Sequence, residues 1–150
     1  MNGVRKETAE GRILGIDLGE KRIGLAVSDP LNLIAQGVPT LTGLSEKQAF
    51  AAIGALVLER AVARIVLGLP LNMNGSEGPQ ARNARRFGED LRRALRIPVD
   101  FWDERLTSRS AERVLLEADM SRRRRKLVLD RLSAQLILQG YLDNKKQVTR

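Results

Sequence analysis

Residues 13–29 have the sequence ILGIDLGEKRIGLAVSD. Two apolar runs flank four polar residues in this stretch, which predicts two buried strands joined by a hairpin turn. A four-residue turn sets the register, so that Asp17 should face Gly24 and Gly15 should face Ala26. Since these pairs carry small side chains, we expect the sheet surface beside Asp17 to be bare enough for another molecule to approach closely.

The rest of the chain predicts one more leading strand and then alternating helices and strands. Expected strands cover residues 13–18, 23–28, 34–41, 65–69 and 99–102, and expected helices cover residues 45–61, 79–96, 107–118 and 126–142. Short turns join the first three strands, which favours an antiparallel meander, whereas strands that alternate with helices enter a sheet in parallel. We therefore expect an α/β fold with a mixed five-stranded sheet and helices on both faces. It should form a single domain with polar tails at about residues 1–11 and 143–150.

The composition excludes several classes of chemistry. Histidine and cysteine are both absent from the 150 residues. This rules out Ser-His-Asp and Cys-His nucleophiles, zinc sites, haem and iron–sulfur ligation. A metal bound by this chain has to be a hard cation with oxygen ligands, such as Mg²⁺ or Mn²⁺.

The charge balance favours a polyanionic partner. Lysine and arginine number 26 against 18 acidic residues, for a net charge of +8, and most of the cations are arginine. A basic α/β domain of this kind suggests nucleic acid. The alternative is a GC-rich genome that places arginine at solvated positions. No apolar run of membrane-spanning length occurs and residues 1–11 lack an apolar signal core, so we expect a cytoplasmic protein without membrane contact.

Asp17 is the first candidate for a functional acid. It lies inside an expected strand, between Ile16 and Leu18. Aspartate is depleted in strands, and a central strand offers its side chain little water. The alternative is an aspartate at the end of a strand that accepts hydrogen bonds from the amides of the turn.

Asp130 and Glu104 are two further candidates. Asp130 shares the apolar face of the last helix with Ala134 and Ile137, away from the main polar stripe of Arg131, Gln135 and Gln139. A carboxylate on the buried side of a helix needs a cation, which is either a metal ion or an arginine. Glu104 follows an expected parallel strand at the edge of the sheet where ligands usually bind, although it could also be an ordinary loop acid.

These three acids can share one site. Asp17 and Glu104 lie at the same end of parallel strands, and the last helix can bring Asp130 toward both. Three neighbouring carboxylates repel one another and raise one another's pKa values, which one or two divalent ions would relieve. Two such ions can clamp the attacking water and the leaving oxygen of a phosphodiester without histidine.

Four segments resemble the YqgF family of Holliday-junction-resolvase-like proteins and pre-16S rRNA nucleases, which have the RNase H-like fold. They are ILGIDLGEKRIGLAVSD (13–29), IVLGLPLNMNGSEGPQARNARRF (65–87), DERLTSRSAERVL (103–115) and DRLSAQLILQGYLD (130–143). The resemblance implies that Asp17, Glu104 and Asp130 are the catalytic and metal-binding acids. It also implies metal-dependent cleavage of phosphodiesters, with processing of the 5′ end of pre-16S rRNA as the role. Ribosomal particles are then expected partners.

Other functions remain open at this stage. One is cleavage of four-way DNA junctions, for which a homodimer would be suited. Another is a non-catalytic RNA- or ribosome-binding module whose acids are structural. An actin-like sugar kinase or ATPase also uses D-x-G strands, but 150 residues are too few for its two large domains.

Basic and polar residues near the three acids are the expected nucleic-acid contacts. They are Lys21, Arg22, Arg105, Ser108, Arg109, Arg122, Arg123, Arg124, Arg125 and Lys126. Residues 121–126 form the expected loop before the last helix, where the family usually has glycine and lysine. Phosphate contacts of this kind add affinity and salt dependence without reading sequence, and a solvated run of charge is the alternative. The loop at residues 71–78 could close over a substrate or be a plain connection, and Trp102 and Tyr141 are expected in the core.

Overall fold

The computed structural model describes residues 11–106 and 121–148, without the side chains of residues 125–131 and 145–148. The described elements are β1 (Arg12–Leu18), β2 (Arg22–Ser28), β3 (Ala35–Thr42), α2 (Glu46–Glu59), β4 (Val62–Leu69), α3 (Pro79–Leu95), β5 (Val99–Asp103) and α5 (Arg122–Val148). The helix expected over residues 107–118 lies outside the described residues.

The strands form a five-stranded sheet in the order β3-β2-β1-β4-β5. β1 pairs antiparallel with β2, and β2 with β3, whereas β4 runs parallel to β1 and β5 parallel to β4. The hairpin has the expected register, with Asp17 opposite Gly24 and Gly15 opposite Ala26. The sequence-based prediction of a mixed sheet is therefore confirmed.

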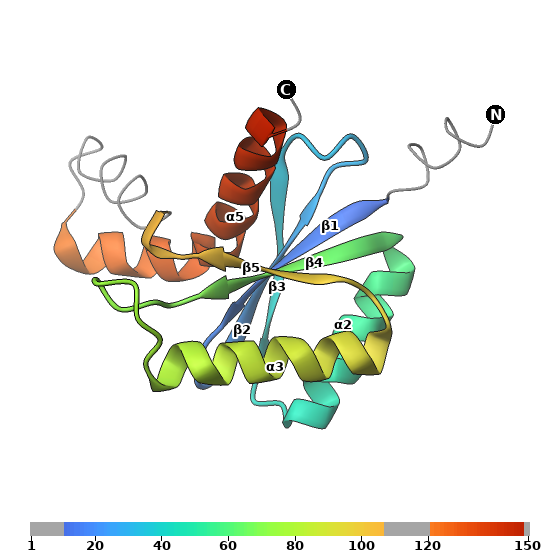
Figure 1. The fold of residues 1–150 in the computed structure, drawn as a ribbon, viewed down its shortest axis with the longest axis horizontal. Coiled ribbons are helices and arrows are strands. Elements are labelled where there is room, and N and C mark those ends of the chain that lie inside the picture. The colour runs from blue at the N-terminus through green and yellow to red at the C-terminus, as the bar shows by residue number, and fades with distance from the viewer. Residues whose placement is uncertain (1–10, 107–120, 149–150) are drawn as a thin grey trace.

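Helices α2 and α3 cover one face of the sheet and α5 lies on the other, as Figure 1 shows. The α2 and α3 face holds the larger apolar core, to which β1 contributes Leu14 and Ile16. Helix α2 begins with the expected capping box, in which the Ser45 side chain accepts from the Gln48 backbone N–H and the Gln48 side chain accepts from that of Ser45. Helices on both faces are thus confirmed.

Helix α5 packs closely on β1 because β1 has a glycine there. A Cβ added at Gly15 would lie only 2.7 Å from Leu138 Cβ and 3.1 Å from the carbonyl oxygen of Ala134. Any side chain at Gly15 would therefore push the helix off the sheet. We had expected this bare surface to admit another molecule; instead, α5 of the same chain occupies much of it.

Both bounds expected for α5 are wrong, since the helix also extends past residue 142 to Val148, through most of the expected polar tail. The helix begins at Arg122 and includes the arginine run, which we had assigned to a loop. Ser121 stands just before it, and its hydroxyl accepts a hydrogen bond from the backbone N–H of Arg124 at 3.3 Å. The run can be helical because arginine has a high helix propensity, and a serine directly before it supplies a side-chain cap.

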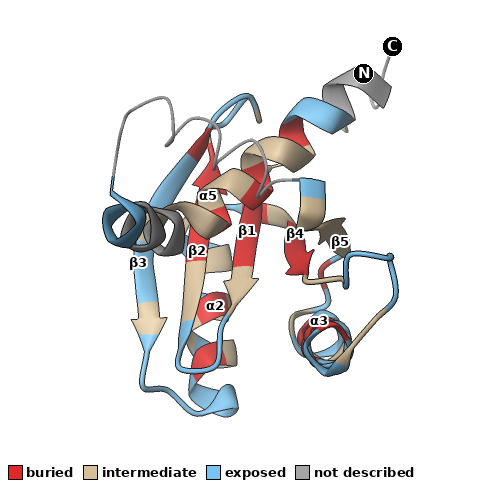
Figure 2. Cartoon of the chain, turned by 90° about the vertical axis from the view of Figure 1, so that its left-hand side faces the viewer, coloured by how far each residue is buried: buried red, intermediate tan, exposed pale blue. Residues whose placement is uncertain are grey.

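Two glutamines of α5, Gln135 and Gln139, bind the edge strand of the sheet. The sequence analysis had placed them only in the polar stripe of the helix and did not predict these contacts. Gln135 Nε2 donates to the carbonyl of Ala35 at 3.1 Å, and Gln139 Oε1 accepts from the backbone N–H of Ala35 at 2.9 Å. Figure 2 shows that β3 is largely exposed, in contrast to the buried middle strands. Side-chain amides here satisfy backbone groups at the start of an edge strand.

No helix within residues 11–106 and 121–148 combines the length and the apolar character that crossing a bilayer requires.

Candidate active site

Asp17 lies near the carboxyl end of β1, on the face that α5 covers. Its neighbours Ile16 and Leu18 point to the opposite face, into the α2 and α3 core, because side chains alternate along a strand. Across the hairpin, a Cβ added at Gly24 would lie 3.5 Å from Asp17 Cβ and 3.5 Å from Ala134 Cβ. Asp17 is therefore partly buried between β2 and the helix.

Gly68 of β4 lies between Asp17 and Glu104, and its lack of a side chain leaves room for the Glu104 carboxyl group. Ile16 pairs with Leu67 across β1 and β4, so Asp17 and Gly68 follow as the next positions toward the carboxyl edge. A Cβ added at Gly68 would lie 3.0 Å from both Cγ and Cδ of Glu104. Neighbouring strands are about 4.8 Å apart, so β1 and β5 are separated by about twice that distance. The glutamate bridges this gap by lying over a strand position that has no side chain.

The surroundings of the Glu104 carboxyl group disfavour its ionised form. Burial, then the negative charges of Asp17 and Asp103, raise the pKa of Glu104 to about 7. Its backbone N–H donates to the carbonyl of Leu69 at 3.2 Å, which fixes the residue at the end of β4. The structure thus brings Asp17 and Glu104 together, close enough for one charge to act on the other.

Asp103, next to Glu104, is directed to a cation instead. Arg105 donates from Nη2 and Nε to the Asp103 carboxylate at 2.7 Å and 3.0 Å, and this hydrogen bonding lowers the pKa of Asp103. Arg105 Nη1 also donates to the carbonyl of Met73 at 3.0 Å. We had expected Arg105 to bind nucleic acid; in this structure its donors hold Asp103 and the loop after β4.

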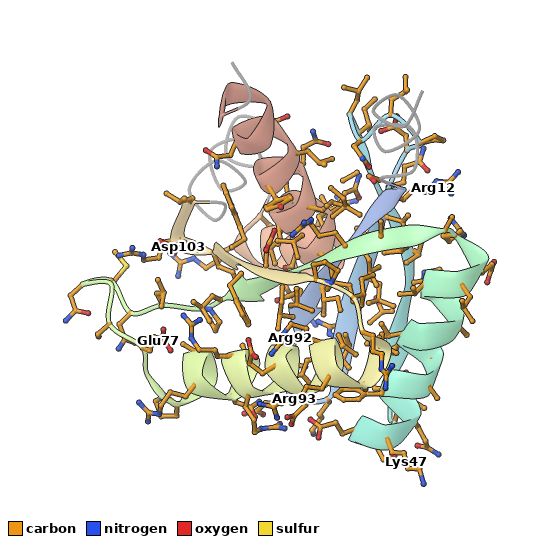
Figure 3. All side chains as sticks on the ribbon, turned by 45° about the vertical axis from the view of Figure 1, so that its right-hand side comes forward. Arg12, Lys47, Glu77, Arg92, Arg93 and Asp103 are labelled. Atoms are coloured by element: carbon orange, nitrogen blue, oxygen red, sulfur yellow. The ribbon has the colours of Figure 1, made fainter. Side chains whose placement is uncertain are left out.

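The loop between β4 and α3 has its own hydrogen bonds. The Gly75 N–H donates to the Asn72 carbonyl at 2.8 Å, and Asn72 Nδ2 donates to Ser76 Oγ at 2.9 Å. Together with the bond from Arg105, these contacts hold the loop at the carboxyl edge of the sheet. Figure 3 shows Asp103 and Glu77 at this end of the molecule and Arg12, the first residue of β1, at the opposite end.

Position 130 lies on α5, and the contacts of that helix indicate toward which end of β1 it lies. Leu142 packs in one cluster with Ile13 at the start of β1, whereas Ala134 lies beside Gly24, which faces Asp17. From Leu142 back to Ala134, the helix therefore runs toward the carboxyl end of β1. Position 130 is about one turn before Ala134 along α5, a helix that Figure 1 shows to be sharply bent. Its side chain is outside the description, and the side chains that are described include no group of three potential metal ligands.

Cationic residues lie at the same edge. A hollow of about 260 Å³ beside Asp17 is lined by Lys21 and Arg22 of the hairpin turn and by Thr40 of β3. Arg122, Arg123 and Arg124 are exposed in the first turn of α5. The expected contacts Ser108 and Arg109, and the side chains of Arg125 and Lys126, lie outside the description.

Gly68 is the residue that the sequence analysis missed. The signal was available, because a glycine inside the apolar strand sequence IVLGL indicates close approach of another group. The group that approaches Gly68 could not be identified from the sequence, because it depends on the pairing of β4 with both β1 and β5. Trp102 and Tyr141 pack partly buried against the α5-side core, as expected, with their rings 6.4 Å apart at an interplanar angle of 86°.

Comparison with known proteins shows the relatives of this chain. The family described as "RuvX: Holliday junction resolvase" matches residues 11–144. A protein of Syntrophomonas wolfei is 57% identical over 132 residues, covering 88% of this chain and 94% of the relative. One of Myxococcus xanthus is 52% identical over 132 residues, covering 88% and 87%. Both are named "Putative pre-16S rRNA nuclease".

A solved structure of T. thermophilus RuvC in complex with a Holliday junction substrate resembles this fold. The TM-score is 0.61 over 91% of this chain and 96% of that chain, at 12% sequence identity. At this identity the likeness concerns the fold, and it confirms the expected RNase H-like architecture.

Proposed function

Because the chain belongs to the RuvX family, the family that its motifs resemble under the name YqgF, we propose that it is a nuclease acting on structured nucleic acid. Its proposed substrate is the 5′ end of pre-16S rRNA, in precursor ribosomal particles of the cytoplasm. The observation that carries this proposal is the Glu104 carboxyl group lying over Gly68 at the end of the sheet where Asp17 lies. An acid with a purely structural role usually has a cation beside it, whereas Glu104 is buried next to the negative charge of Asp17.

The donor set suits a hard divalent cation, Mg²⁺ or Mn²⁺. Asp17, Glu104 and Asp130 would hold it through carboxylate oxygens, the ligands these ions prefer. Burial, and after it the negative charges of Asp17 and Asp103, raise the pKa of Glu104, and a bound cation would stabilise its ionised form. One or two bound ions would supply Lewis-acid activation of water and of the departing oxygen.

The chain's own residues position the substrate. Lys21 and Arg22 would contact phosphates beside Asp17, and the exposed arginines at the start of α5 would contact phosphates further along the strand. The Asp103–Arg105 pair, with its bond to Met73, keeps Glu104 and the neighbouring loop in place. Arg105 is accordingly a positioning residue in this proposal.

Cleavage by the pure protein tests the proposal. Labelled pre-16S rRNA, single-stranded RNA and a four-way DNA junction would be incubated with Mn²⁺, with Mg²⁺ or with EDTA. We expect divalent-dependent cleavage of the rRNA precursor that Asp17→Asn and Asp130→Asn abolish. Glu89→Gln is the matched control because Glu89 pairs with Arg92 on the surface of α3, away from the acids. Cleavage that survives Asp17→Asn would contradict the proposed site.

A four-way DNA junction is the second candidate substrate. The description of the matching family names Holliday junction resolvases. Symmetric cutting of two strands would require a homodimer with two equivalent sites. Faster cleavage of the junction than of the rRNA precursor, by a dimeric species in solution, would favour this function over the first.

A further inference from the structure

A second hollow lies at the same end of the sheet as Asp17, on the side of α2 and α3. Its volume is about 360 Å³, which lies in the range of pockets that take small molecules. It is enclosed by the β1–β2 turn, the connection from β3 to α2, and α3. Figure 2 shows that this turn and this connection lie at one end of the molecule.

The floor of this hollow is apolar and its rim is polar. Leu18, Leu41 and Phe87 line it from the core side. Leu44 also lines it and remains 43% exposed. Lys21 and Asn83 are exposed residues of the lining. An apolar floor under a few polar groups suits a flat, partly polar ring better than it suits an ion.

A hydrogen bond from Arg86 orients the side-chain amide of Asn83. Arg86 Nη2 donates to its side-chain oxygen at 3.0 Å, while Arg86 also pairs with Glu46 at 2.9 Å. The bond occupies the amide oxygen and leaves the NH₂ group as the donor that a ligand can use. Arg86 is thus bonded to Glu46 and Asp90 as well as to Asn83.

The hollow adjoins the candidate active site across the β1–β2 turn. Gly19, Glu20, Lys21 and Arg22 line both this hollow and the smaller one beside Asp17. Asp17 and Leu18 are adjacent in β1 with side chains on opposite faces of the sheet. A nucleic-acid strand with one phosphate at Asp17 would cross the hairpin turn and bring a flanking nucleotide to Leu18.

We propose that this hollow binds the base of an unpaired nucleotide next to the phosphate that is cut. This inference rests on the proposed nuclease function and deepens it. The apolar floor would pack against the base, the Asn83 NH₂ group would donate to an acceptor on its edge, and Lys21 would contact the adjoining phosphate. The base is held while the neighbouring phosphodiester lies at the acids.

The inference specifies the substrate class. A base inside an uninterrupted duplex is paired and stacked, so it reaches the hollow only after costly extrusion. Single-stranded flanks, bulges and strand junctions already offer an unpaired base. Cleavage should therefore fall beside unpaired nucleotides in RNA or DNA, and continuous duplex should be a poor substrate.

The test uses the full chain carrying Asp17→Asn, so that the substrate stays intact. It binds a short single-stranded RNA in which 2-aminopurine replaces successive bases on both sides of the mapped cleavage position. We expect a distinct fluorescence change at one flanking position. Adding Leu44→Glu should abolish this change and weaken binding by about tenfold, the scale of losing one base contact. Leu58→Glu is the matched control, because Leu58 is 85% exposed on α2 and receives the same charge outside the hollow.

Asn83→Ala is the second variant, in case Leu44→Glu disturbs the fold. It should reduce the same positional signal, whereas the Leu58→Glu control should keep it. Equal behaviour of Leu44→Glu and Leu58→Glu, or a fluorescence change at no single position, would overturn the proposed base site. Cleavage by the wild-type protein is measured separately with Mn²⁺. A positional signal without cleavage would overturn the nuclease proposal, whereas cleavage without a positional signal would overturn only the base site.

Discussion

Asp100 in β5 and Glu104 just after it lie four residues apart, yet their neighbours are opposite in charge. Asp100 accepts hydrogen bonds from Arg64 Nη1 at 3.0 Å and from the Tyr141 hydroxyl at 2.5 Å. Glu104 instead experiences the negative charges of Asp17 and Asp103. Among the described residues, the acid at the amino end of the sheet has a cationic partner, whereas the charges that act on the acid at the carboxyl end are negative. Asp100 thus anchors α5 through Tyr141, whereas we propose that Glu104 holds a cation.

The largest expected contrast is in activity. Glu104→Gln should reduce the rate of divalent-dependent cleavage at least about a hundredfold, since even residues that only orient metal ligands often contribute that much. Asp100→Asn should leave the rate within about tenfold and instead lower the free energy of unfolding, because it weakens hydrogen bonds to Arg64 and Tyr141. Single-turnover rates and chemical denaturation of both variants measure this. Equal rates for the two variants would remove the distinction.

The second contrast is in the pH dependence of stability without metal. Because the pKa of Glu104 is raised to about 7 by burial and nearby anions, the folded state binds more protons than the unfolded state between about pH 4.5 and 7. The free energy of unfolding should therefore fall as pH rises through this window, by about 2 kcal/mol after allowance for partial exposure.

Urea denaturation in EDTA at a series of pH values checks this expectation. Glu104→Gln should flatten the profile and be the more stable protein at about pH 8, whereas Asp100→Asn should keep the wild-type slope. A wild-type slope of opposite sign in this window would show that Glu104 has a cationic partner in solution. The conclusion that it awaits a cation would then be wrong.

The third contrast concerns Gly68 of β4, over which the Glu104 side chain lies. Gly68→Ala would place a Cβ 3.0 Å from Glu104 Cγ and 2.6 Å from Ile137 Cδ1. We expect about 1–2 kcal/mol of lost stability from this crowding, and about a tenfold lower cleavage rate as the carboxyl group shifts. Gly37→Ala is the matched control, since among the described residues its Cβ would have an ordinary contact of 3.5 Å with Gln135 Oε1. Unchanged cleavage by Gly68→Ala would show that the position of Glu104 over Gly68 is not required.

The smallest expected effect is at Tyr141. Burial, then its hydrogen bond to Asp100, raise the pKa of Tyr141 to about 12, so the hydroxyl stays protonated and donates. Tyr141→Phe should cost about 1 kcal/mol of stability and leave cleavage within about twofold, because Arg64 still pairs with Asp100. Thermal unfolding and the same cleavage assay measure this. A large loss of activity would show that α5 transmits the position of Tyr141 to the acids.

Local signals in the sequence were sufficient for the hairpin and for the start of α2. A short polar turn between two apolar runs fixed the register that sets Asp17 against Gly24, and the Ser45 capping box lies where its spacing predicts. The same local logic placed Glu104 at the carboxyl end of its strand. These expectations were confirmed, whereas the Ser121 cap before α5 and the Asp103–Arg105 pair are local features that were missed.

Features that depend on distant pairing were not predicted. Gly68 leaves room for Glu104 beside Asp17 only because β4 lies between β1 and β5. Gln135 binds the Ala35 carbonyl only because α5 crosses to the edge strand. Parallel pairing and helix docking are set by the burial of surfaces far apart in the chain.

Mn²⁺ binding measured by isothermal titration at pH 7, in two buffers of different ionisation enthalpy, tests most directly whether Asp17 and Glu104 hold a cation together. With a pKa near 7 in the free protein, Glu104 should release about half a proton for each site filled. Glu104→Gln should abolish the release, Asp17→Asn should abolish or greatly weaken binding, and Asp100→Asn should preserve both. Binding of Mn²⁺ without proton release, or binding that Asp17→Asn leaves unchanged, would contradict a shared cation site.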